Sequence, residues 1–302
     1  MELPLVFMDG PWRLGMGLRT LEPGQWLWLD DRHRAETAER RRLIAEKPDE
    51  VVAMPTGTEP ACHELLAAVL EDLARHHAAC HHAACHHAAL PAGGRSDRPL
   101  VDLGGLTQED FCLLMSDADG RHVLRAGVLC FPLHWRLRDK LGLPLRAIHG
   151  PVPGFADRLG DPAERFMASL QPERPVWRAN WTFTEKPDLH QPGRREVDPL
   201  LDCRNAGGRL WLRVERQTLR RLPVSRAVVF GIRSVVRPLG EIAAEPGVAT
   251  ALAARLREME PAMASYKGIP AMREPLLRWL DDAAAVGPAP QQPAARRQAG
   301  AP

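Results

Sequence analysis

Three runs with the two-residue alternation of β-strands limit the fold of this chain more than any other feature of its sequence. Residues 175–183 place three aromatic side chains on one side and Arg178 with Asn180 on the other. Residues 209–217 alternate in the same way, and residues 227–236 form an apolar run. A short loop joins the last two runs, so we expect them to pair as antiparallel neighbours.

Helical patterns precede and follow these runs. Apolar spacing and capping residues predict helices at residues 34–45, 58–77, 107–114, 134–142, 247–259 and 272–285. The segment 107–114 begins with Thr-Gln-Glu-Asp, in which Thr107 is a candidate cap and Asp110 has the position of a capping-box partner. Residues 121–131 predict one more strand. Helices at both ends of a short antiparallel sheet predict an α+β domain.

The length of 302 residues is sufficient for one large domain with a buried core. We expect a single domain over residues 1–285, followed by a disordered tail at 286–302 that is rich in Pro, Gln and Ala. The net charge of +2 argues against nucleic-acid binding, and no apolar run is long enough to span a membrane. No secretion signal is recognisable, and the six cysteines contain no Cys-x-x-Cys pair, so we expect free thiols in a cytoplasmic protein.

The segment 76–90 repeats a five-residue unit of His, Ala and Cys three times. On a helix, the pairs His77/His81 and His82/His86 have the spacing that chelates a divalent metal. A five-residue period turns by about 140° per unit, however, so the units wind around the helix and do not build one site. The sequence therefore favours an expanded repeat over a surface metal site.

The densest polar cluster is the segment 211–223, WLRVERQTLRRLP. Alternation puts Arg213 and Glu215 on one face of this predicted strand. That face is either exposed surface with weak ion pairs or the wall of a polar pocket. In the second interpretation, arginines such as Arg213, Arg216 and Arg220 bind carboxylate or phosphate groups, and the carboxylate of Glu215 accepts a hydrogen bond from a cationic ligand.

Two further residues are candidates for holding a metal. His149 lies between apolar Ile148 and Gly150 in a segment braced by prolines, and it is either a packed loop residue or a metal ligand. Cys130 ends an apolar strand, where it is either a small buried residue or a thiolate ligand. The sequence lacks the motifs of nucleotide-binding dehydrogenases, P-loop nucleotidases, serine hydrolases and zincins.

The chain resembles the haem-dependent oxidative N-demethylase family through an ordered series of motifs: QED, CFPLHW…DKLGLPLRAIHGPVPGF, RANW, LRVERQTLRRLP and YKG. The earlier LGMGL and WLWLDD fit the same pattern, and the likeness covers about residues 10–283. The resemblance implies a PAS-like α+β domain that holds a b-type haem. The activity it implies is the removal of a methyl group from a small secondary amine such as dimethylamine, with consumption of dioxygen and release of formaldehyde. It further implies that NADPH supplies the electrons through a separate flavin and iron–sulfur reductase.

The resemblance makes His149 the expected axial ligand of the haem iron. The expected cofactor-binding residues, whose arginines would pair with haem propionates, are Arg178, Asn180, Arg213, Arg216 and Arg220. The expected catalytic residues are Glu215, Tyr266 and Lys267. A carboxylate can hold a dialkylammonium, and a phenol or an ammonium can donate to the bound oxygen.

Two positions depart from the family pattern. His33 stands where the family has a tyrosine, and the His repeat replaces a stretch of Tyr-Pro character. Neither touches the expected iron site, but both bear on contacts with a partner or within a hetero-oligomer.

Two alternatives to an enzyme stay open: a haem-binding, PAS-like sensor or subunit without turnover, and a scaffold subunit without haem. The sequence favours the enzyme because no output module follows residue 285. The 302 residues also lack the cysteine set of an iron–sulfur centre. Electrons would therefore come from a partner protein.

Overall fold

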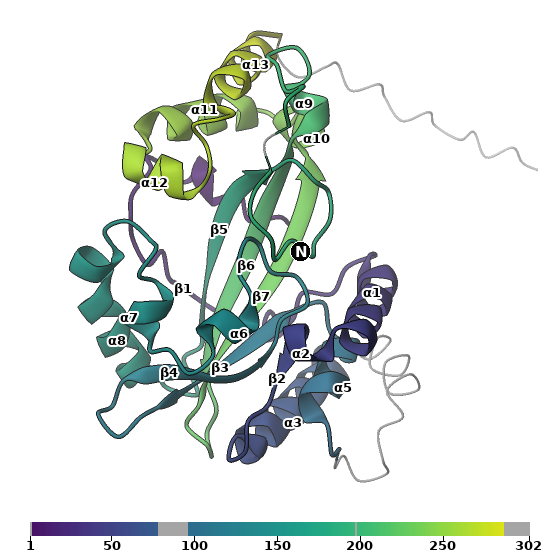
Figure 1. Cartoon of the computed structure of the whole chain (residues 1–302), viewed down its shortest axis with the longest axis vertical. Coiled ribbons are helices and arrows are strands. Elements are labelled where there is room, and N and C mark those ends of the chain that lie inside the picture. The colour runs from purple at the N-terminus through teal and green to yellow at the C-terminus, as the bar shows by residue number, and fades with distance from the viewer. Residues whose placement is uncertain (1, 78–95, 197, 287–302) are drawn as a thin grey trace, which may run out of the picture.

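The computed structural model describes residues 2–77, 96–196 and 198–286, which form a seven-stranded antiparallel sheet with helices packed against it (Figure 1). The strands lie in the order β1-β5-β6-β7-β3-β4-β2. Their bounds are β1 Arg19–Thr20, β2 Val52–Ala53, β3 Asp110–Ser116, β4 His122–Val128, β5 Val176–Thr184, β6 Trp211–Arg221 and β7 Val228–Pro238. The predicted α+β class is confirmed, whereas the likeness to a PAS domain and the single domain over residues 1–285 stay predictions.

The helices form three groups around the sheet (Figure 1). The N-terminal group, at the lower right of Figure 1, contains α1 His33–Glu46, α2 Pro48–Val51, α3 Glu59–His76 and α5 Pro99–Leu106. The central group contains α6 Leu137–Lys140, α7 Leu145–Ile148 and α8 Gly160–Ser169, which follows a π-helical turn at Phe155–Leu159. The C-terminal group, at the top, contains α9 Ala206–Arg209, α10 Leu239–Ala243, α11 Val248–Glu258, α12 Pro261–Tyr266 and α13 Arg273–Val286. A 3₁₀ turn at Val6–Met8 lies near the start of the chain.

The register of β5, β6 and β7 decides which side chains share a face of the sheet. Asn180 of β5 lies opposite Glu215 of β6, which lies opposite Ser234 of β7. Directly opposed residues in antiparallel strands point to the same face. One face, which we call the polar face, therefore carries Arg178, Asn180, Arg213, Glu215 and Gln217.

Two hydrophobic clusters cover the other side of the sheet, which we call the opposite face. The N-terminal helices pack leucines such as Leu65 and Leu103 against Phe111 of β3, all three fully buried. The C-terminal helices pack against Phe183 and Leu212, which are fully buried as well. Complete burial of a leucine or phenylalanine contributes about 1.5–3 kcal/mol, so these clusters hold the strands in register.

The expectation of a helix over 107–114 is wrong, because residues from Asp110 onward form strand β3. The Asp110 carboxylate does not cap a helix. It accepts hydrogen bonds from the backbone N–H groups of Cys130 (2.6 Å) and Phe131 (2.9 Å). It also pairs with the buried Arg40 at 2.6 Å. A helix cap and a buried carboxylate use the same residue types, so only these long-range partners distinguish the two.

The other expected elements are present, with the predicted helix at 134–142 reduced to α6. His76 ends α3 and His77 follows it, but the rest of the His repeat lies outside the described residues. Val286 ends α13, and the predicted tail beyond it lies outside them as well. The cysteines that the structure describes, Cys62, Cys112, Cys130 and Cys203, are free thiols. Within the described ranges, none of the helices has the length and apolar character needed to cross a membrane.

Replacement of Asp110 by alanine is expected to lower the free energy of unfolding by about 3–5 kcal/mol, because it leaves the buried Arg40 guanidinium without its counter-charge. Urea denaturation measures this loss. The control is Glu71→Ala on α3, which breaks an exposed ion pair with Arg75 and should cost no more than about 0.5 kcal/mol. Equal losses in the two variants would contradict the assigned role of Asp110.

Candidate functional site

Side chains from two strands of the polar face and from the ends of two helices make up a polar region on this side of the sheet. Arg178 and Asn180 come from β5, Glu215 from β6, Lys267 from the turn after α12, and His149 from the end of α7. Besides the larger effect of burial, the charge of Glu215 raises the pKa values of Arg178 and Lys267, and the charge of Arg178 lowers the pKa of His149, so each of these groups is within electrostatic range of the next. These five residues are called the candidate site below.

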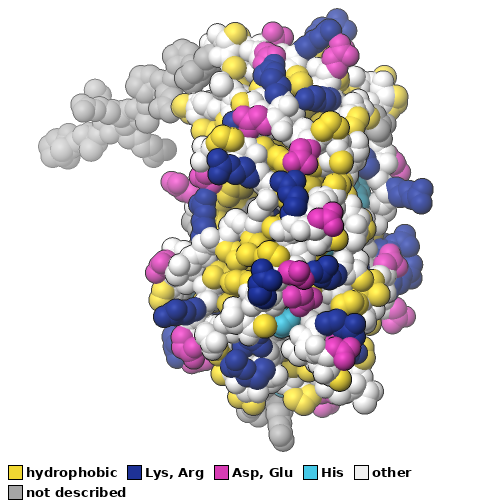
Figure 2. All heavy atoms as spheres, turned by 90° about the vertical axis from the view of Figure 1, so that its left-hand side faces the viewer, with side chains coloured by type: hydrophobic (Ala, Val, Ile, Leu, Met, Phe, Trp, Pro, Cys, Tyr) yellow, Lys and Arg dark blue, Asp and Glu magenta, His cyan; other side chains and the backbone are white. Residues whose placement is uncertain are grey.

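The surroundings of the candidate site are partly apolar. In Figure 1, α12 and α7 lie one above the other on the same side of β5. Figure 2 views this side, and hydrophobic side chains gather near its middle. Ile148, which precedes His149, packs in one hydrophobic cluster with Phe230 and Ile232 of β7. The register places Phe230 and Ile232 on the same side of the sheet as the polar face. They form an apolar surface next to its polar residues.

His149 is held as a neutral imidazole with one nitrogen available. Its Nδ1 donates to the carbonyl oxygen of Leu145 at 2.9 Å, and its ring stacks on Phe155 at 4.4 Å between centroids. Burial lowers the pKa of His149, and the cations of Lys140 and Arg178 lower it further, against the opposing effect of the bond to Leu145. Among the described residues Nε2 has no partner, so it presents a free lone pair. A histidine held in this way can bind a metal through Nε2.

The guanidinium of Arg178 lacks a hydrogen-bond acceptor within the described part of the chain. Its guanidinium donates no hydrogen bond to any described residue, and its Nε atom is buried. Burial lowers the pKa of Arg178, and only the carboxylate of Glu215 acts against that effect. A buried donor without an acceptor costs about 1–3 kcal/mol and is uncommon in a folded protein. The environment of Arg178 is therefore suited to an anionic ligand.

Lys267 lies against β5. Its Nζ donates to Asn180 Oδ1 at 2.9 Å and to the carbonyl oxygen of Trp181 at 2.6 Å. Burial lowers the pKa of Lys267 to about 8, although Glu215 acts in the opposite direction. The neighbouring Tyr266 lies at the rim with half of its surface exposed, and burial of the phenol followed by the charge of Glu215 raises its pKa. Lys267 can therefore exchange a proton near neutral pH.

Arg213 orients Glu215, and all three of its nitrogens already donate to acceptors within the protein. Its Nε donates to Glu215 Oε1 at 3.2 Å. The other two nitrogens donate to the carbonyl oxygens of Leu189 (2.9 Å) and Phe131 (2.5 Å) and to the hydroxyl of Ser234 (2.9 Å). Gln217 Nε2 donates to Glu215 Oε2 at 3.2 Å. Both carboxylate oxygens of Glu215 are thus positioned, with lone pairs left for a further donor.

Arg216 and Arg220 do not join the candidate site, because the alternation of β6 turns both to the opposite face. Arg216 donates to the backbone carbonyls of Gln25 and Trp26, and the guanidinium of Arg220 lies 4.5 Å from the Trp26 ring. The expected clamp made of Arg213, Arg216 and Arg220 is therefore not formed.

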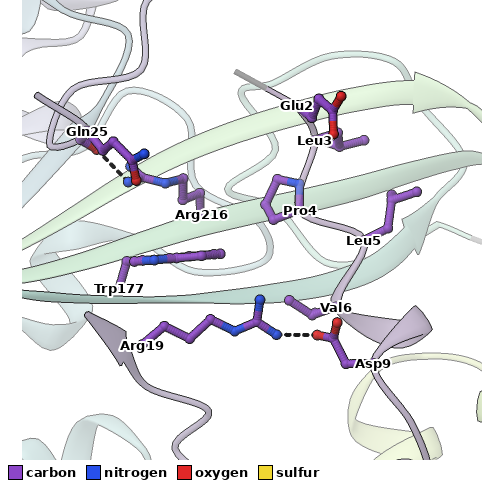
Figure 3. A pocket seen from close by; sticks show the side chains of 10 residues that line it. All are labelled: Glu2, Leu3, Pro4, Leu5, Val6, Asp9, Arg19, Gln25, Trp177 and Arg216. Atoms are coloured by element: carbon purple, nitrogen blue, oxygen red, sulfur yellow. Dashed lines mark hydrogen bonds and ion pairs between the residues drawn. The ribbon is translucent and has the colours of Figure 1, made fainter. Parts of the chain in front are cut away.

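A hollow of about 240 Å³ lies beside Arg216 on the opposite face (Figure 3). Figure 3 shows the Trp177 ring between Arg216 and Arg19. The two guanidinium carbons lie 5.4 Å and 5.3 Å from its centroid. Arg19 also pairs with Asp9, and the N-terminal segment lines the rest of the hollow.

Three residues around the candidate site were not expected from the sequence: Lys140, Phe155 and Arg195. Lys140 donates to the carbonyl oxygen of Ile148 at 3.2 Å and lies over the Trp135 ring. One sequence signal was available for Lys140, since only four of the 40 basic residues are lysines. Nothing in the sequence distinguishes Arg195 from the other 35 arginines.

A model of the family described as haem-dependent oxidative N-demethylase, alpha subunit-like, matches residues 17–277. The chain belongs to this family. The match confirms the resemblance seen in the sequence and includes every residue of the candidate site. The description of the family indicates haem dependence, oxidative N-demethylation and one subunit of a larger enzyme.

The residues of the candidate site fit the haem that the family description implies. Nε2 of His149 is free to bind an iron, and the unpaired guanidinium of Arg178 matches a propionate. Phe230 and Ile232 provide an apolar surface nearby. The described residues contain no group of three or more His, Cys, Asp or Glu side chains that could hold a bare metal ion. An iron that a porphyrin already holds needs a single protein ligand, which Nε2 of His149 can provide.

Replacement of Arg178 by methionine is expected to raise the free energy of unfolding of the haem-free protein by about 1 kcal/mol, because it removes a buried donor without an acceptor. Arg213→Met is the matched control on the same face. It should lower the free energy of unfolding by about 3 kcal/mol, because it leaves Glu215 and two carbonyl oxygens without their donor. Urea denaturation measures both values. A similar loss of unfolding free energy in the two variants would contradict the view that Arg178 lacks an acceptor within the protein.

Proposed function

We propose that this protein is the haem-binding subunit of an oxidative N-demethylase that acts on a small methylated amine such as dimethylamine. The observation that carries the proposal is the presence, in one site, of a neutral imidazole with a free Nε2 and a guanidinium whose buried Nε atom has no acceptor. In this proposal His149 is the axial ligand, and Arg178 binds a propionate. When bound, haem supplies the activation of dioxygen and the path for electrons to the substrate.

Glu215 is proposed to bind the nitrogen of the substrate. Arg213 and Gln217 fix its two oxygens, so an incoming amine meets a carboxylate that needs no reorientation. The N–H group of a secondary amine donates to one of the remaining lone pairs. A charge-assisted hydrogen bond of this kind is about twice as strong as a neutral one, which favours small amines over neutral molecules of the same size.

Lys267 and Tyr266 are proposed to donate hydrogen bonds and protons on the oxygen side of the reaction, and Asn180 to hold Lys267 in place. The pKa of Lys267, lowered to about 8 by burial, supports this role because the ammonium can release and regain a proton near neutral pH. Tyr266 lies at the rim, where its hydroxyl can exchange protons with solvent.

Electrons are proposed to come from a partner. The description of the family as alpha subunit-like supports an enzyme with several different chains. We infer that NADPH reduces a flavin and iron–sulfur reductase, which passes single electrons to this subunit in the cytoplasm. The free thiols among the described cysteines support an intracellular location.

Turnover is tested by incubating the haem-loaded protein with dimethylamine, dioxygen, NADPH and a flavin and iron–sulfur reductase. One formaldehyde and one methylamine should form per dimethylamine consumed. Haem binding without formaldehyde from any small methylated amine would contradict the enzyme and favour a haem-binding subunit without turnover.

His149→Ala is expected to abolish the Soret band of protein reconstituted with haem, because it removes the axial ligand. The absorption spectrum measures this loss. The matched control is His63→Ala on α3, on the opposite face, where the imidazole hydrogen-bonds only to backbone carbonyls. A Soret band of normal position and intensity in His149→Ala would overturn the ligand assignment.

Glu215→Gln is expected to raise the Kd for dimethylamine by roughly tenfold, because the charge-assisted hydrogen bond becomes a neutral one. Titration of the Soret shift with dimethylamine measures the Kd. Glu196→Gln, which breaks an exposed ion pair with Lys186, serves as control and should leave the Kd unchanged. Equal affinity in the Glu215 variant and the parent protein would exclude Glu215 as the amine-binding residue.

A further inference from the structure

Strand β5 is only partly covered on its outer side, because the terminal strand β1 is two residues long. Among the described residues, β1 pairs with Val176 and Trp177 alone. Further along, two backbone carbonyls on this edge accept hydrogen bonds from side chains. Lys267 Nζ donates to the oxygen of Trp181 at 2.6 Å, and Arg195 Nη2 donates to the oxygen of Phe183. Two cationic side chains from distant segments thus donate to backbone carbonyl oxygens that would otherwise accept from a neighbouring strand.

Arg195 also binds the turn that carries Lys267. Its Nη1 donates to the carbonyl oxygen of Gly268 at 3.1 Å, and its side chain is only 12% exposed. Glu185, just after β5, lies 3.6 Å from the same nitrogen and provides the counter-charge. One guanidinium therefore joins the end of β5 to the turn after α12.

Gly268 and Arg195 are packed so closely that each restricts the other. Gly268 has a φ of +67°, which residues with a side chain rarely adopt. A Cβ atom at this position would lie 2.7 Å from Cδ of Arg195, so any other residue would have to displace the arginine. The turn and the guanidinium are therefore one structural unit.

We propose that Arg195 is a positioning residue of the candidate site, which clamps the turn at 266–268 onto the open edge of β5 and so holds Lys267 against Asn180, facing Glu215. The role of Lys267 in this inference rests on the proposed function. The position of Lys267, in contrast, depends only on the polypeptide and can be tested without haem. An arginine is required because its planar fork reaches two carbonyl oxygens at once, whereas a lysine presents a single point of contact.

The charges around Lys267 give the proposal a measurable consequence. Glu215 of β6 raises the pKa of Lys267, whereas Arg178 of β5 and Arg195 lower it, in addition to the larger effect of burial. Tyr266 is the remaining titratable neighbour. Loss of Arg195 removes one cation and frees the turn, and both changes stabilise the charged form of Lys267.

The titration of Lys267 can be followed directly, because the chain contains only four lysines: Lys47, Lys140, Lys186 and Lys267. Full-length protein labelled with lysine-¹³Cε, reduced and saturated with carbon monoxide so that any bound haem is diamagnetic, should give four signals. Lys267→Arg assigns one of them. This signal should titrate near pH 8 in the parent protein and at least about one pH unit higher in Arg195→Gln, toward the ordinary value of 10.5.

Arg194→Gln is the matched control, because Arg194 is the exposed neighbour of Arg195 and lies outside the candidate site; the titration of Lys267 should not move in this variant. Gly268→Ala provides a second route if Arg195→Gln fails to fold, since its methyl group must displace Arg195 and should give the same upward shift. An unchanged titration of Lys267 in whichever of these two variants folds would overturn the proposal.

The spectrum of the haem separates this inference from the proposed function. Arg195→Gln should keep the Soret band of the parent, because Arg195 contacts neither His149 nor Arg178. A parent protein that binds no haem would refute the proposed function and leave the titration of Lys267 as a valid test. Normal haem binding with an unchanged titration of Lys267 would refute the positioning role alone.

Discussion

The pairing register of β5, β6 and β7 is the constraint on which the rest of the molecule depends. It sets Asn180 opposite Glu215, and Glu215 opposite Ser234, so that polar groups from three strands meet on one face. A slip of one residue in any strand would send its polar set to the opposite face. Both faces resist such a slip: Arg213 donates to four partners on one, and Phe183 is fully buried by helices on the other.

Arginines on the sheet differ in whether their donors are used, and that difference distinguishes the structural arginines from Arg178, the proposed ligand-binding one. Arg213 and Arg233 are both fully buried, and each donates to backbone or side-chain acceptors through all three nitrogens. Arg178 has no acceptor at all among the described residues. Such a group lowers the stability of the protein without its ligand, a cost that functional sites commonly carry.

The motif QED, which helps to identify the family, holds the scaffold together and lies away from the candidate site. Gln108 donates to Asp30 and to Glu36, and Glu109 accepts from the backbone N–H of Trp28 at 2.6 Å. These bonds attach the N-terminal segment and α1 to the loop that leads into β3. A motif that identifies a family can therefore serve the fold of its members and not their active site.

The sequence by itself determined the α+β class, the four strands β4 to β7, the family and the face of each residue within its own strand, because periodicity and motifs are local properties. Only the tertiary structure decided that Asp110 begins a strand, and that Arg195 binds a glycine 73 residues further along the chain. Alternation along β6 already separated Arg213 from Arg216, but proximity in sequence suggested a single clamp. Spacing along a chain fixes the direction of a side chain, whereas its partners depend on strand register and loop closure, which residue spacing does not encode.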